Sequence, residues 1–143
     1  MNEGSWEECK ESGSVIECTP DSAKAKSLKS TAEERIKFLT RKKPEREDAR
    51  FLFEGCYSST IEIIHAYVLL KGFKVVNHIC LGYYLRDIMK RNDLFRIFNE
   101  CRVRRNSLVY YGKNMSYNMA GKSIDNLIFL MKEISMIIDN MLK

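Results

Sequence analysis

Residues 120–141 read AGKSIDNLIFLMKEISMIIDNM, and apolar side chains recur in this stretch at alternating steps of four and three. The positions that follow this rhythm are Ala120, Ile124, Leu127, Met131, Ile134, Ile138 and Met141. Such spacing forms one apolar stripe and predicts a helix that begins near Ser116. The pattern serves a helix within its own bundle as well as a helix that pairs with a second copy, and we favour the first alternative because bundles commonly use it.

Four further helices are expected from similar spacing in the sequence before residue 116. The predicted segments are residues 20–39, 44–70, 77–88 and 93–108. Proline or aspartate stands near their starts and glycine after two of their ends, as helix termini prefer. No run of period two competes with them. The sequence therefore predicts an all-α fold, a five-helix up-and-down bundle.

The composition agrees with a few long helices in one domain. The chain has 143 residues, of which only 7 are glycine and 2 are proline, so turn-forming residues are scarce. Residues 1–19 are acidic and lack a sustained helical period, and we interpret them as an N-terminal arm with Trp6 as its only large anchor. Residues 20–143 form the predicted helical domain.

The cysteines and the termini bear on the cellular compartment. There are five cysteines with no zinc-type spacing, namely Cys9, Cys18, Cys56, Cys80 and Cys101. We therefore expect reduced, mostly buried thiols and no metal site. The N-terminus does not resemble a signal peptide, and no apolar run approaches the length of a membrane span. These features predict a cytoplasmic protein that does not enter the membrane.

A basic residue interrupts the apolar stripe of the predicted helix at residues 93–108. Arg105 stands on the line of Leu94, Phe98, Cys101 and Leu108, where a buried residue is expected. On the neighbouring face Arg102, Asn106 and Tyr110 follow at steps of four, so their polar ends can converge. An arginine in this setting snorkels, pairs with a carboxylate or binds an anionic ligand, and the spacing leaves these alternatives open.

The charge distribution and the histidines add weaker indications. The formal net charge is +5, and basic residues concentrate in residues 24–46 and 86–113. Basic helices with nearby tyrosines suit RNA, although such runs are also typical of a solvated face. His65 is expected to be a core or interface residue, and His78 begins the third predicted helix.

Several segments in order along the chain carry a resemblance to a known family. They are residues 6–9, 27–28, 31–35, 53–57 and 72–78, and above all residues 105–112, RNSLVYYG. With them the whole chain resembles archaeal members of the HEPN (higher eukaryote and prokaryote nucleotide-binding) domain family. The resemblance implies a helical bundle that forms a homodimer and is often paired with a small nucleotidyltransferase in a toxin–antitoxin-like system. Active members are metal-independent ribonucleases, so no cofactor is implied.

The family motif consists of an arginine, a polar residue, three further residues and a histidine. Carried over to this chain, it falls on Arg105, Asn106 and Tyr110, which are the candidate catalytic residues, and tyrosine replaces the histidine. Some members carry a tyrosine, modified by the partner enzyme, two residues after the histidine. That position is Gly112 here, which leaves Tyr110 or Tyr111 as the substitute. The candidate ligand-binding residues are Arg102, Arg105, Asn106, Tyr110 and Tyr111.

The replacement of histidine by tyrosine matters for catalysis more than for binding. A histidine with a pKa near 6.5 is available as a base at pH 7, whereas a tyrosine with a pKa near 10 is about one part in a thousand ionised. This deficit corresponds to roughly 4 kcal/mol. We therefore expect a module that binds a nucleotide, RNA or a partner protein. The alternatives are a ribonuclease that uses Tyr110, and a purely structural role for Arg105 and Asn106.

Overall fold

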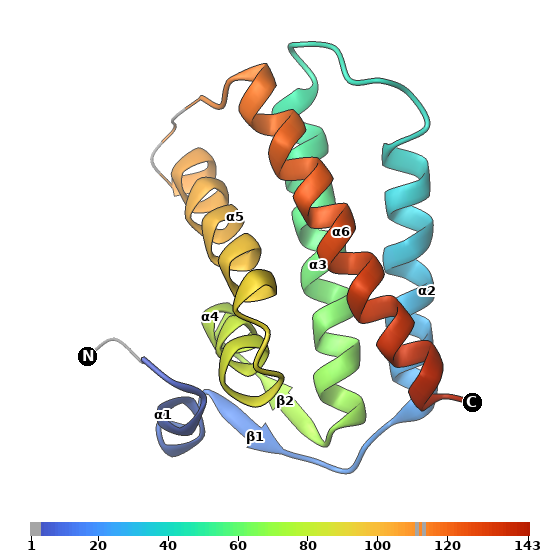
Figure 1. Cartoon of the computed structure of the whole chain (residues 1–143), viewed down its shortest axis with the longest axis vertical. Helices are drawn as coiled ribbons and strands as arrows, with labels where there is room; N and C mark the ends of the chain where they lie inside the picture. The colour runs from blue at the N-terminus through green and yellow to red at the C-terminus, as the bar shows by residue number, and fades with distance from the viewer. Residues whose placement is uncertain (1–3, 111, 113) are drawn as a thin grey trace.

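The computed structural model describes residues 4–110, 112 and 114–143 (Figure 1). Its elements are α1 (Trp6–Glu11), β1 (Val15–Glu17), α2 (Ser22–Leu39), α3 (Ala49–Leu70), β2 (Phe73–Val75), α4 (His78–Tyr83), a π-helical turn η1 (Tyr84–Ile88), α5 (Asn92–Tyr110) and α6 (Tyr117–Met141). The all-α class is confirmed, because the described residues are mainly helical. The number of helices differs from the prediction, since the described residues form six α-helices.

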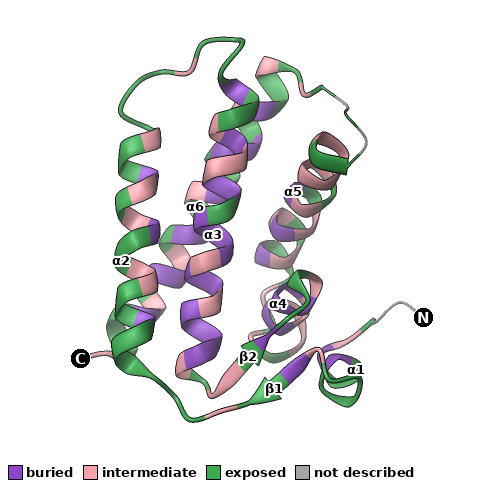
Figure 2. Cartoon of the chain, turned by 180° about the vertical axis from the view of Figure 1, so that it is seen from behind, coloured by how far each residue is buried: buried purple, intermediate pink, exposed green. Residues whose placement is uncertain are grey.

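Four long helices, α2, α3, α5 and α6, run alternately up and down in Figure 1. Helix α3 lies at the centre and packs against both α2 and α6, while α5 packs against α6 and α4. Buried side chains extend along almost the whole of α3 (Figure 2). Among them Phe53, Ile63 and Ile64 are fully enclosed. The bundle is therefore organised around this one helix, whose apolar surface faces neighbours on several sides.

Capping residues determine where three of the helices, α2, α4 and α6, begin. The side chains of Asp21, Asn77 and Ser116 each accept a hydrogen bond from a backbone N–H in the first turn of α2, α4 and α6. These bonds satisfy amide groups that lack a partner inside the helix. The predicted starts at Asn77 and near Ser116 are confirmed, whereas the first helix, predicted from residue 20, begins two residues later at Ser22.

The predicted start of the second helix is wrong. Helix α3 begins at Ala49 and not at Pro44. The carbonyl oxygen of Pro44 accepts a hydrogen bond from the Tyr117 hydroxyl at 3.0 Å, so it is turned towards α6. The third predicted helix, residues 77–88, is present, but only its first six residues form the α-helix α4, and Tyr84–Ile88 widen into the π-helical turn η1. Propensity and periodicity do not reveal such tertiary contacts.

A short antiparallel hairpin of β1 and β2 closes one end of the bundle. It pairs Val15 with Val75 and Glu17 with Phe73. Each strand has three residues, which is too short to produce a detectable alternation of polar and apolar side chains. Gly72 precedes β2 with a φ of +91°, and a Cβ there would lie 3.1 Å from the carbonyl oxygen of Cys18. Glycine is therefore required at this turn.

The first 19 residues, predicted as an arm, contain α1 and β1. The Trp6 side chain is 2% exposed and meets Phe73 and Tyr84 edge to face, with ring centroids 5.3 and 4.8 Å apart. The backbone N–H of Trp6 also donates to Asp87 Oδ2 at 2.8 Å. This segment therefore shares its core with α4 and the hairpin.

Cys9 and Cys80 form a disulfide, so the prediction that all five thiols are reduced is wrong for this pair. The residues lie 71 positions apart, but α1 packs on α4 and brings their Cα atoms to 6.1 Å. The spacing of the cysteines along the sequence does not reveal this contact. Disulfides persist chiefly in oxidising compartments, with intracellular proteins of hyperthermophilic archaea as an exception. Reduced thiols can therefore no longer be used as an argument that the protein is cytoplasmic.

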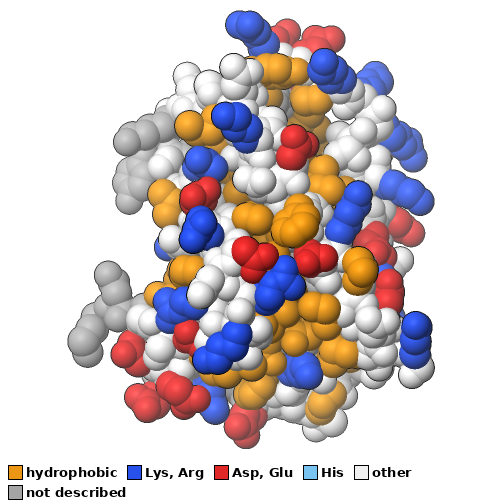
Figure 3. Space-filling model, in the orientation of Figure 1, with side chains coloured by type: hydrophobic (Ala, Val, Ile, Leu, Met, Phe, Trp, Pro, Cys, Tyr) orange, Lys and Arg blue, Asp and Glu red, His pale blue; other side chains and the backbone are white. Residues whose placement is uncertain are grey.

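The two basic segments lie on opposite flanks of the bundle. Residues 24–46 lie along α2 and the loop after it, the described residues 86–110 lie along η1 and α5, and α3 and α6 separate the two segments (Figure 1). On the face shown in Figure 3, Lys and Arg side chains lie at both sides and across the middle, mixed with acidic side chains. In the described part of the chain, no helix combines the length and the apolarity that crossing a membrane requires.

Loss of the disulfide is expected to destabilise the fold. Replacing Cys9 and Cys80 together by alanine removes a cross-link between residues 71 apart, and the chain-entropy model gives a loss of about 4 kcal/mol in the free energy of unfolding. Urea denaturation of the oxidised proteins measures it. Cys18→Ala, at a half-buried free cysteine, is the matched control and should change stability little.

The single variants test the link more sharply. Cys9→Ala and Cys80→Ala should each lose about as much stability as the double variant, because either one breaks the bond. Losses that add up independently would contradict a disulfide between these residues.

Candidate functional site

A cleft of about 400 Å³ opens between α5, the middle of α3 and the junction between β2 and α4. Its polar lining residues are Tyr57, Asn77, His78, Arg102, Arg105, Asn106 and Tyr110. Side chains that are far apart in the sequence therefore face one space. Pockets that bind small ligands have comparable volumes and a similarly small set of convergent polar groups.

Helix α5 supplies one wall with four of the five predicted ligand-binding residues. Arg102, Asn106 and Tyr110 follow one another on the same face, as their spacing predicts, and Arg105 lies beside them. Tyr111, the fifth, lies outside the described residues.

Arg105 lies between two aromatic rings. The carbon at the centre of its guanidinium is 5.8 Å from the ring centroid of Tyr57 and 5.7 Å from that of Tyr110. Tyr57 is buried, whereas Tyr110 is 67% exposed. Side chains five positions apart on a helix point about 140° apart, so residues 105 and 110 would not be expected to meet on the same helix. Their long side chains nevertheless bend towards each other, and no second copy of the chain is needed to bring them together. The rings hold the cation by its faces, which leaves the N–H edge to bind an acceptor.

The edge of Arg105 has one weak polar contact, a donation from Nη1 to Asn106 Oδ1 at 3.5 Å. Arg102 donates from Nη2 to Asn99 Oδ1 at 3.1 Å, while its Nε is buried without a hydrogen-bond partner in the described structure. A buried donor that lacks an acceptor costs about 1–3 kcal/mol. This nitrogen has almost no accessible surface, so a ligand in the cleft would reach it only if the side chain moved.

The other arginines near this site differ in their partners. Arg91 pairs with Asp93 and Glu133. Arg104 turns to α6, donates to Ser123 Oγ at 3.1 Å and lies 3.9 Å from Glu100. Over residues 4–110, 112 and 114–143, neither Arg102 nor Arg105 has an acidic partner. Of the three alternatives for Arg105, the described structure thus lacks carboxylate pairing, and snorkelling and binding an anion remain.

His78 lies on the rim of the same cleft, where the sequence analysis placed no histidine. The Asn77 side chain caps α4 and starts the helix at His78, and the His65 ring of α3 lies beneath with a centroid distance of 5.9 Å. Crowding by neighbouring protein atoms and the charge of Arg105 lower the pKa of His78 below 6.5. The imidazole is therefore neutral at pH 7 and able to accept a proton.

Tyr57 is the second functional residue that the sequence analysis missed. Burial raises the pKa of its phenol to about 12, although Arg105 and Arg102 act in the opposite direction. The ring therefore stays neutral and serves as a platform under Arg105. Tyr57 and His78 both lie in segments that carry the family resemblance, but spacing alone assigns neither of them to a site.

Within the described ranges, no group of three His, Cys, Asp or Glu side chains is arranged to hold a metal ion. Comparison of the chain with protein-family models, with curated proteins and with solved structures finds no match. The assignment of a function therefore depends on the chemistry of the cleft.

The buried His65 makes stability depend on pH. Burial, and then the charges of His78 and Lys24, lower the pKa of His65 to about 4. The unfolded chain takes up this proton near pH 6.5, so the free energy of unfolding should fall as the pH drops from 6.5 to 4, by about 3 kcal/mol in total. Urea denaturation across this range measures the loss.

The variant His65→Phe lacks the titrating imidazole. Its free energy of unfolding should therefore depend less on pH between 6.5 and 4 than that of wild type. The carboxylates titrate in both proteins and cancel in the comparison. Parallel profiles for wild type and His65→Phe would show that His65 titrates normally.

Proposed function

We propose that the cleft binds a phosphate group of a nucleotide or of RNA. The observation that carries this proposal is the presence of two arginines, Arg102 and Arg105, that face one cleft and lack an acidic partner in the described structure. Arginine matches the geometry of phosphate oxygens, and in the described structure the Arg105 guanidinium makes only one weak hydrogen bond, to Asn106. The exposed ring of Tyr110 supplies a surface on which a base can stack.

The wider setting of this proposal comes from the resemblance to HEPN domains. We infer a nucleotide-, RNA- or partner-binding helical module that forms a homodimer and associates with a small nucleotidyltransferase in a toxin–antitoxin-like pair. Sedimentation of the purified chain tests the dimer. Co-purification with the product of a neighbouring nucleotidyltransferase gene tests the partner.

A second candidate function is metal-independent cleavage of RNA, with Tyr110 at the usual position of the histidine. The observation that favours it is His78, which shares the cleft with Arg105 and is neutral at pH 7. In this scheme an imidazole nitrogen takes the proton of a ribose 2′-hydroxyl. The 2′-oxygen then bonds to phosphorus, the 5′-oxygen leaves with a proton, and a 2′,3′-cyclic phosphate forms. Arg105 stabilises the added negative charge.

Binding is tested with a fluorescein-labelled single-stranded RNA by anisotropy, and with ATP as competitor. Arg105→Gln and Arg102→Gln should each weaken binding about 10- to 100-fold, because each removes a charged hydrogen bond to phosphate. Arg96→Gln is the matched control, because Arg96 is an exposed residue of the same helix outside the cleft. It should bind within about twofold of wild type, apart from a weak salt effect.

The same variants separate binding from a structural role. If wild type binds neither RNA nor ATP and Arg105→Gln loses several kcal/mol of stability, Arg105 only ties α5 to its neighbours. Equal effects of Arg105→Gln and Arg96→Gln would show non-specific attraction and contradict the proposed cleft.

Cleavage is tested by single-turnover assays of RNA in EDTA. His78→Asn should slow the reaction about 100-fold or more, and Tyr110→Phe should slow it much less. The lowered pKa of His78 leaves the base mostly neutral above pH 6.5, so the rate should rise as the pH increases towards 6.5 and level off above it. A large loss in Tyr110→Phe without one in His78→Asn would assign the role of base to tyrosine. Absence of cleavage, or cleavage unchanged in both variants, would rule out this second function.

A further inference from the structure

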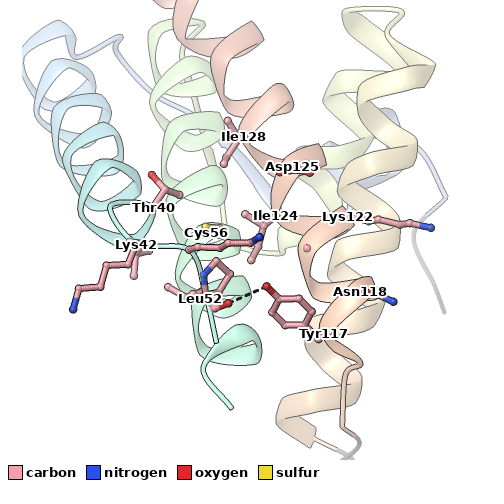
Figure 4. Close-up of a pocket in the computed structure, with 14 residues that line it drawn as sticks. Thr40, Lys42, Leu52, Cys56, Tyr117, Asn118, Lys122, Ile124, Asp125 and Ile128 are labelled. Atoms are coloured by element: carbon pink, nitrogen blue, oxygen red, sulfur yellow. Dashed lines mark hydrogen bonds between the residues drawn. The ribbon is translucent and has the colours of Figure 1, made fainter. Parts of the chain in front are cut away.

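A second cavity, of about 460 Å³, lies on another side of α3, between α2, the loop after it and α6 (Figure 4). Its walls are mainly apolar and include Leu39, Leu52, Ile124 and Ile128. Its volume is in the usual range for small-molecule sites, and apolar walls with a few polar groups are typical of such sites.

Gly121 borders this cavity and stands inside α6, where glycine destabilises a helix relative to alanine. Packing explains two other helical glycines. A Cβ at Gly55 would lie 2.6 Å from the Leu39 side chain, and one at Gly82 would lie 2.5 Å from Phe98. A Cβ at Gly121 would meet no atom within 4 Å. Packing within the described chain therefore does not require this glycine, and its missing side chain keeps the cavity open.

The mouth of the cavity is positively charged. Lys42 and Lys43 from the loop and Lys122 from α6 border it, against the single carboxylate of Asp125. None of these four residues forms an ion pair with another described residue. In Figure 4 the side chains of Lys42 and Lys122 point away from the cavity in opposite directions, so each would have to turn to reach a bound anion.

The interior offers no reactive group. Cys56 lies on the floor, and burial raises the pKa of its thiol to about 11, so the sulfur is protonated and behaves as a small apolar group. The Tyr117 hydroxyl is engaged with the Pro44 carbonyl, a bond that ties the loop to α6 at the edge of the cavity (Figure 4). The cavity is thus suited to binding and not to covalent chemistry.

We propose that this cavity binds a small molecule with an apolar body and one anionic head group, such as a medium-chain carboxylate. The apolar body lies between α2, α3 and α6 beside Gly121, and the head group lies among Lys42, Lys43 and Lys122. This site shares no lining residue with the Arg105 cleft and does not depend on the function proposed for it.

The experiment uses octanoate as the probe and 1-octanol as its uncharged match, with binding measured by titration calorimetry of the full chain. Wild type should bind octanoate saturably with a Kd below about 1 mM, and more tightly than octanol. Gly121→Leu fills the cavity and should weaken octanoate binding at least tenfold. The triple variant Lys42→Ser/Lys43→Ser/Lys122→Ser should weaken octanoate about fivefold and leave octanol unchanged.

Asn126→Leu is the matched control, because it places the same side chain at an exposed position of α6 outside the cavity. It should bind octanoate as wild type does. Gly121→Leu should melt at or above the wild-type temperature and retain RNA binding, which separates this test from that of the Arg105 cleft.

Three results would overturn the proposal: no binding of octanoate by wild type, equal binding by Gly121→Leu and Asn126→Leu, or octanol binding as tight as that of octanoate. A wild-type dimer that Gly121→Leu converts to monomer would overturn it as well, because the cavity would then be an interface between copies.

Discussion

The edge-to-face packing of Trp6 on Phe73 and Tyr84 joins the N-terminal segment to the hairpin and to η1. Tyr84 in turn meets Tyr67 of α3 at 5.6 Å, so the cluster extends into the central helix. Aromatic pairs in such orientations add to the stabilisation that burial provides. The Cys9–Cys80 disulfide fastens the same junction covalently. An isolated helix as short as the six-residue α4 is unstable, so its place depends on these links together with its packing against α3 and α5.

The position of α4 determines what the cleft can do. The long helix α5 forms one wall and presents Arg102, Arg105 and Tyr110 on it, independently of where α4 lies. The other wall contains His78, whose place depends on the cap at Asn77 and on the packing of α4. Arg105 also lowers the pKa of His78, and a bound phosphate would offset that charge and favour the imidazolium. Binding of phosphate as proposed would therefore be coupled to the protonation of His78.

Local chemistry made much of the helical framework predictable. Asn77 and Ser116 could be identified as helix starts because capping involves only the next few residues. Arg105 stood out because a cation interrupted a regular apolar stripe. Tertiary contacts were not accessible in this way. The Cys9–Cys80 bond, the turn of Pro44 towards Tyr117 and the approach of His78 to Arg105 all join segments that are distant in the sequence. The periodicity of apolar residues describes one helix or strand at a time and does not reveal which elements pack against each other.

The two cavities meet at α3. Tyr57 lines the Arg105 cleft and Cys56 lines the apolar cavity, and consecutive residues of a helix point about 100° apart. A buried central helix can therefore serve two separate spaces, each completed by a different outer helix, α5 for the cleft and α6 for the cavity. A substitution in α3 would disturb both sites through their shared support. Arg105 and Gly121 each lie on an outer helix and line one space, so their variants can report on the two sites independently.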